Sequence, residues 1–253
     1  MIFVKNIFKR SKSLGQFGLL NFLLFFVLLV TSFFDDRTLM GVNIWMKPMK
    51  FAVSIGIFSW TMAWYLFYLP QIRKVQKIKL TIITAMLIEQ VIIIYQASRG
   101  ELSHFNVSSI GNAVLFQLMG IAILINTGMV FWAYLLFAKV ESLFSGYKRG
   151  IQLGMLIFVV ASLEGFLMVG NLSHTVGAPD GQEGIFFLNW AKTYGDLRVF
   201  HFLGLHALQA VPLFAWFYAR DNVKRVNIFA AIYLILSLGT LWNAMAGRGL
   251  FWG

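Results

Sequence analysis

The sequence predicts an all-α fold: a polytopic membrane protein built as one bundle of seven transmembrane helices over residues 1–253. The chain is 59% hydrophobic and 12% charged, with a mean hydropathy of +0.75. A soluble domain carries about 25% charged residues, so a soluble globular fold is excluded. Disorder requires low hydrophobicity and high charge, so it is excluded as well.

The positions of the formal charges divide the chain into apolar windows of membrane-spanning length, since a spanning helix needs about 20 apolar residues. Two windows contain a glutamate, Glu89 and Glu164. The first window follows a basic N-terminus, and no small-residue cleavage site follows it, so we expect an uncleaved span. The predicted spans are about residues 14–34, 51–70, 79–97, 111–137, 151–171, 199–219 and 226–246.

The distribution of basic residues predicts the orientation of these spans. Of the 21 Lys and Arg residues, 14 lie in the N-terminal tail and the loops on its side, and 7 lie on the other side. The positive-inside rule then places the N-terminus in the cytoplasm and the C-terminus outside, in a cell membrane of the bacterial cytoplasmic type. Topology accounts for the net charge of +11, so we expect the lipid bilayer and not nucleic acid as a partner.

Polar side chains from four predicted spans are expected at one depth. Glu164 and His206 each lie seven residues inside the predicted outer end of their span, about 10 Å at the helical rise, Gln117 lies six residues inside, and Glu89 lies seven residues below Gln96, which is near the outer end of its span. Ionisable groups inside a membrane are costly and indicate function. We therefore predict an outward-opening pocket with these four residues as its floor, and catalytic roles for the two glutamates and His206.

All four histidines of the chain lie in the predicted outer half: His104, His174, His201 and His206. Histidine is the commonest transition-metal ligand and a usual axial ligand of haem. We therefore predict that these histidines bind a metal ion or haem, and a trio of His104, His174 and His201 would suit zinc or copper. The chain has no cysteine, so a thiolate site is excluded.

Three arginines stand at the predicted outer ends of spans: Arg99, Arg198 and Arg248. A guanidinium group holds two acceptor oxygens at once, so these residues suit haem propionates or a lipid phosphate. Together with Gln117 they are the predicted cofactor-binding residues. The expected partner at this face is a lipid-soluble or anionic small molecule.

Two local patterns carry further expectations. Ser103 precedes His104 and Ser173 precedes His174, but adjacent residues are not expected to form a serine–histidine pair. Small residues let membrane helices approach each other closely. The glycines expected to do so are Gly120, Gly128, Gly154, Gly165 and Gly170.

Three functions fit these predictions. The first is a cofactor-dependent protein that binds haem or a transition-metal ion and acts in redox chemistry or on a lipid-soluble substrate. The second is a proton-coupled transporter, because intramembrane Glu and His residues form proton relays. The third is a non-catalytic assembly or sensory subunit in which polar residues only join helices. No nucleotide-binding loop or zinc-protease motif is present, so whether the protein is an enzyme stays open.

Overall fold

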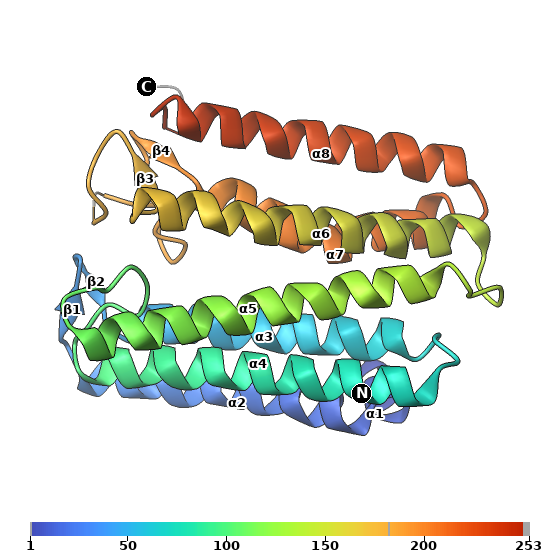
Figure 1. Cartoon of the computed structure of the whole chain (residues 1–253), viewed down its shortest axis with the longest axis horizontal. Coiled ribbons are helices and arrows are strands. Elements are labelled where there is room, and N and C mark those ends of the chain that lie inside the picture. Colours follow the sequence, from blue (N-terminus) through green and yellow to red (C-terminus); the bar gives the residue numbers. More distant parts are fainter. Residues whose placement is uncertain (1, 182, 250–253) are drawn as a thin grey trace. The chain divides into compact units, whose positions relative to one another are not determined.

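The computed structural model describes residues 2–181 and 183–249, which form helices joined by short loops and two small hairpins. The chain divides into two compact units, unit 1 within Met1–Met129 and unit 2 within Val130–Gly253 (Figure 1). Each unit is described by itself below. The prediction that residues 1–253 act as one domain stays a prediction.

Unit 1 contains two strands and the helices that precede unit 2. At one end α1 leads into α2, and at the opposite end β1 and β2 pair as an antiparallel hairpin with Thr38 opposite Asn43 (Figure 1). Met40 and Gly41 at its turn both have positive φ, which matches the right-handed twist of a two-residue hairpin. The elements are α1 (Ile2–Arg10), α2 (Lys12–Phe34), β1 (Thr38–Leu39), β2 (Val42–Asn43), α3 (Met46–Leu66), α4 (Ile72–Ser98) and the first part of α5 (Ile110–Phe137).

Helices α2 and α3 pack closely because each presents a glycine to an aromatic ring of the other. The Trp60 ring of α3 fills the space where a side chain would stand at Gly18, and its indole N–H donates to the carbonyl of Gly15 over 3.0 Å. The Phe22 ring of α2 occupies the same kind of space beside Gly56. Small residues thus set this helix pair, as is usual in membranes.

Unit 2 contains the last part of α5, three further helices and a second hairpin. Strands β3 and β4 are antiparallel, with Thr175 opposite Asp196, and lie at the end of the unit where α6 ends and α7 begins (Figure 1). The remaining elements are α6 (Ser145–Asn171), β3 (Thr175–Val176), β4 (Gly195–Asp196), α7 (Arg198–Tyr218) and α8 (Val223–Met245).

The α6–α7 contact is the closest helix packing in unit 2. A Cβ added at Gly154 would stand 2.7 Å from the carbonyl oxygen of Ala207, and one at Gly150 would stand 2.7 Å from the Cβ of Ala215. Pro212 interrupts the hydrogen-bond ladder of α7, and its ring lies 3.2 Å from the same added Cβ at Gly154. Glycine is therefore required where the two backbones meet.

The glycines expected to allow close packing behave in different ways. Gly154 confirms the expectation, and Gly165 leaves room for the ring of His201. At Gly120, Gly128 and Gly170 an added Cβ would meet nothing within 4 Å, so these three glycines allow no close approach within their own unit. The sequence shows where a glycine could allow two helices to approach closely, but it does not show which face of the helix meets a neighbour.

The protein is an all-helical, multi-pass membrane protein, as predicted. Among the described residues, six helices are long and apolar enough to cross a bilayer: α2, α4, α5, α6, α7 and α8. The predicted span at 51–70 is helical as α3, which is not among these six. The count of seven and the orientation of the termini stay predictions.

Several helices extend past their predicted spans. Helix α4 starts at Ile72 where 79 was predicted, and α6 starts at Ser145 where 151 was predicted. The segment added to α4 is rich in Lys, Arg and Gln, which are good helix formers although they are not apolar, and the segment added to α6 contains Lys148 and Arg149. An apolar window therefore underestimates the length of a helix that continues beyond the bilayer.

Candidate functional site

Each unit contains one buried glutamate that lies against an imidazole ring. In unit 1, Oε1 of Glu89 on α4 lies 3.4 Å from Nε2 of His104. In unit 2, Oε2 of Glu164 on α6 lies 3.2 Å from Nδ1 of His201. The second oxygen of each carboxyl group is buried and has no hydrogen-bond partner among the described residues. Such a buried orphan atom requires an explanation, because almost all buried polar groups are paired.

The two pairs share a gradient of exposure. The side chains of Glu89 and Glu164 are only 2% and 4% exposed, whereas those of His104 and His201 are 22% and 29% exposed. The imidazole is thus the more accessible member of each pair, and the carboxyl group lies behind it.

His104 is held in the loop between α4 and α5. The hydroxyl of Ser103 lies 3.1 Å from Nδ1 of His104, on the other side of the ring from Glu89. A neutral imidazole with its proton on Nε2, the nitrogen that faces the carboxylate, can accept at Nδ1 from this hydroxyl. The expectation that adjacent Ser103 and His104 do not pair is therefore wrong. The chain bends at this point, and Phe105 has a φ of 57°. The side chains of Ser103 and His104 therefore do not point to opposite sides, as they would in an extended strand.

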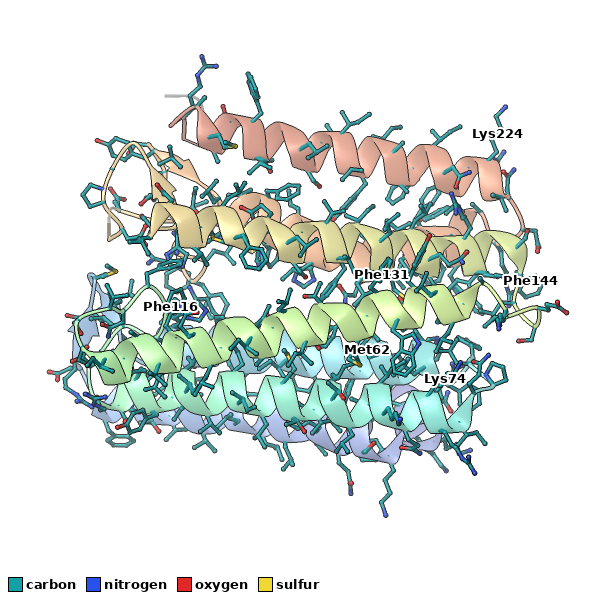
Figure 2. All side chains as sticks on the ribbon, in the orientation of Figure 1. Met62, Lys74, Phe116, Phe131, Phe144 and Lys224 are labelled. Atoms are coloured by element: carbon teal, nitrogen blue, oxygen red, sulfur yellow. The ribbon has the colours of Figure 1, made fainter. Side chains whose placement is uncertain are left out.

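Three phenylalanine rings surround His104. Phe51 of α3 has its ring centre 5.8 Å from the imidazole, and Phe105 and Phe116 each lie at 6.2 Å. Figure 2 labels Phe116 on α5, in the part of that helix that belongs to unit 1. Apolar rings exclude water from the region of the imidazole–carboxylate contact, which strengthens any electrostatic interaction there.

Hydrogen bonds from α4 and α5 hold this loop in place. The buried side chain of Gln96 donates to the carbonyl of Leu102 over 3.2 Å and to Oδ1 of Asn112 over 3.0 Å. Arg99 donates to Gln96 over 3.3 Å and to Asn112 over 3.5 Å. Asn106 donates to Leu102 from the other side over 2.9 Å. Arg99, a predicted cofactor-binding residue, therefore takes part in the network that positions the loop.

His201 is positioned by a helix. It lies in the first turn of α7, one turn after Leu197, whose carbonyl accepts its backbone N–H. The absence of a side chain at Gly165 leaves the imidazole Cε1 in ordinary contact, 3.7 Å from where a Cβ would stand. The close α6–α7 packing thus brings the ring of His201 to Glu164.

His174 pairs with Asp180 in the loop after α6. Asp180 accepts from the backbone N–H and Nδ1 of His174, from the hydroxyl of Ser173 and from both donors of Thr175, over 2.6–3.1 Å. Burial raises the pKa of Asp180, but the hydrogen bond and charge of His174 and the two hydroxyl groups outweigh burial and hold that pKa below its usual range. The Ser173 hydroxyl donates to Asp180 over 2.7 Å.

A second carboxylate, Asp196, organises the approach to α7, and our sequence reasoning missed it. Asp196 is 4% exposed and accepts from the backbone N–H of Ala191 and from the backbone and guanidinium of Arg198. Arg198 also donates to the carbonyl of Asn189. The signal was an Asp three residues before the first residue of the predicted span at 199–219, close to where an acidic side chain caps a helix start.

The remaining predicted residues lie elsewhere. His206 and Gln209 share a face of α7, with Nδ1 of His206 3.1 Å from Oε1 of Gln209 and the centre of the Phe202 ring 4.2 Å from that of the imidazole. Gln117 is exposed on α5, so Glu89 has His104 and not Gln117 as its partner. Arg248 lines a cavity of about 10 Å³ beside α8.

No group of three or more His, Asp or Glu residues in the described part of the chain is arranged to hold a metal ion. Each imidazole of the two pairs instead has one carboxylate as its partner. The predicted convergence of Glu89 and Gln117 with Glu164 and His206 involves both units and stays a prediction.

Comparisons of the chain with protein-family models, with curated proteins and with solved structures give no match. The fold and the two pairs define the class: a multi-pass membrane protein with two buried glutamates on helices of spanning length, each against a partly exposed imidazole ring.

Proposed function

We propose that this protein is a proton-coupled transporter in which Glu89–His104 and Glu164–His201 are the proton-binding groups. The observation that carries the proposal is the repeated pattern of a buried carboxyl group, one oxygen against a partly exposed imidazole and the other without a partner. The proposed cargo is the lipid-soluble or anionic small molecule expected at the face that carries the histidines.

The chemistry of each pair suits a proton relay. Imidazole is the side chain whose charge changes near neutral pH, so it can take a proton from water and pass it on. A carboxyl group shielded from water pays a large desolvation cost as an unpaired anion, so it is stabilised by a proton or by an imidazolium partner. A proton would therefore enter at His104 or His201 and reach the glutamate behind it.

The test is the decay of an imposed pH gradient across liposomes that contain the purified protein and an internal pH-sensitive dye. Wild-type protein should dissipate the gradient, and Glu89→Gln or Glu164→Gln should slow this about 100-fold, the low end for loss of a positioned proton-transfer group. Glu183→Gln removes a highly exposed carboxylate and is the matched control. Equal rates in wild type and both buried variants would contradict the proposal and favour a packing role for the polar residues.

A metal- or haem-dependent function is the second candidate, and one observation favours it. A carboxylate that holds one ring nitrogen of a histidine is a common arrangement behind a metal ligand, since it orients the other nitrogen. Glu164 and His201 have this relation. The iron, copper and zinc content and the haem absorption band of wild type should be compared with those of His201→Ala. A stoichiometric metal or haem that is lost in the variant would replace the proton proposal.

We further propose that α3 is the seventh span. Trp45 at its start packs with Leu28 near the end of α2, and Arg10 lies 3.7 Å above the ring of Trp64 near its end. Helix α3 therefore runs back along the whole length of α2, and its 21 residues extend about 31 Å. Seven spans place the termini on opposite sides of a bacterial cytoplasmic membrane, with the N-terminus in the cytoplasm.

Reporter fusions test this topology. A reporter on the C-terminus should be active outside the cytoplasm, and one in the loop after α3 should be active inside. A C-terminal reporter in the cytoplasm would contradict the seven-span count.

A further inference from the structure

We infer that unit 1 contains a binding site for an anionic phospholipid at the end where α2 and α4 begin. A groove of about 320 Å³ lies there, between the first turn of α2 and the second and third turns of α4. Its lining combines cationic, polar and aliphatic side chains. The residues are Ser13 of α2 and Gln76, Lys77, Lys79, Leu80 and Ile83 of α4.

The charges at this end of unit 1 favour an anion. Lys77 and Lys79 both line the groove, and neither forms an ion pair with a carboxylate among the described residues. The sequence contains no Asp or Glu from residue 1 to 34 or from 37 to 88. The first acid further along α4 is Glu89, ten residues from Lys79 or about 15 Å, and it is paired with His104. A bound anion would therefore be the partner of the two ammonium groups.

The order of residues along α4 favours an amphipathic anion. The polar lining, Gln76 to Lys79, comes first, and Leu80 and Ile83 follow on the next turn toward the middle of the helix. Leu80 is 67% exposed. A phospholipid presents its phosphate at the membrane surface and its acyl chains deeper, so it matches both parts of the groove. A free phosphate would leave the aliphatic part unused.

The experiment measures the thermal unfolding midpoint of the purified protein in neutral detergent as lipid is added. Phosphatidylglycerol should raise the midpoint of the wild type by several degrees, and phosphatidylcholine should not. Lys77→Gln combined with Lys79→Gln should lose most of the rise. Lys139→Gln combined with Lys224→Gln is the matched control, because it removes the same charge from exposed positions in unit 2 (Lys224 is labelled in Figure 2).

Native mass spectrometry provides the second readout, since it counts retained lipid even when a variant is less stable. The Lys77 and Lys79 variant should retain phosphatidylglycerol at least about fivefold less than the control, and Leu80→Asn should also reduce retention. Equal loss in both lysine variants would overturn the site in favour of a general charge effect. An equal rise with phosphatidylcholine or with inorganic phosphate would also overturn it.

Discussion

The two glutamate–histidine pairs have similar contacts but different supports. His104 belongs to a loop, and its position depends on Ser103, on three phenylalanine rings and on the hydrogen bonds of Gln96. His201 belongs to a helix, and its position depends on the glycine contacts between α6 and α7. The same chemical pair is thus obtained once by a hydrogen-bonded loop and once by helix packing.

Because their supports differ, the two pairs should respond to substitutions at different places in the chain. A substitution in the α6–α7 contact should disturb Glu164–His201 and leave Glu89–His104 in place. A substitution in the loop between α4 and α5 should do the reverse. If both pairs bind protons, the two kinds of variant should each lose one proton-binding site.

The largest effect is expected at the α6–α7 contact. Gly154→Leu would force a side chain into the backbone of Ala207, and overpacking of this kind costs about 3 kcal/mol. The thermal unfolding midpoint should fall, and Glu164 should lose its partner. Gly170→Leu, on the same helix where an added Cβ meets nothing within 4 Å, is the control. A similar fall in both variants would contradict the proposed role of this contact.

Removal of the charge on Asp180 should have the next largest effect. Asp180→Asn weakens charged hydrogen bonds from His174 and Thr175, and each such bond contributes about 1.5–3 kcal/mol. Hydrogen exchange of the backbone amides of residues 173–180 should become faster in the variant at neutral pH. Unchanged exchange would show that the loop does not depend on this carboxylate.

The same carboxylate predicts a pH dependence. The pKa of Asp180 is lowered in the folded protein, so its stabilisation is fully present above the unfolded value of about 3.8 and is lost as pH falls below it. When the pH is lowered from about 5 to about 3, the unfolding midpoint of the wild type should therefore fall more steeply than the unfolding midpoint of Asp180→Asn. Parallel curves for the two proteins would contradict the low pKa.

The smallest effect is expected from Ser103→Ala. The substitution removes one neutral hydrogen bond to His104, a loss of about 1 kcal/mol, and leaves His201 unchanged. Nitrogen NMR of the imidazole rings should show a shift for His104 alone. Ser98→Ala is the control, because the Ser98 hydroxyl bonds only within its own helix. A shift of the His201 signals would contradict the separation of the two pairs.

The sequence predicted the helical class well because apolar windows of spanning length have few alternatives. It also singled out Glu89, Glu164 and all four histidines, since charge inside an apolar window is conspicuous. It did not predict the partners. Glu89 pairs with a loop residue, His104, and the turn that places it depends on local bends and hydrogen bonds that have no period in the sequence.

The loop carboxylates were harder still to predict. Asp180 and Asp196 lie in a segment between two spans, where an acid is ordinarily a solvated residue. Their role as acceptors for Thr175 and Arg198 follows from how the β3–β4 hairpin folds back on itself. Short strands of two residues have no hydropathy pattern, so the sequence does not predict this hairpin.

The central claim is that the two buried carboxyl groups take up and release protons, and infrared difference spectroscopy tests it most directly. Purified protein in lipid should show a protonated-carboxyl band whose intensity changes with pH. Glu89→Gln and Glu164→Gln should each remove part of that band, and the double variant should remove the rest. A band that neither substitution alters, or no protonated carboxyl group at any pH at which the protein stays folded, would contradict the account.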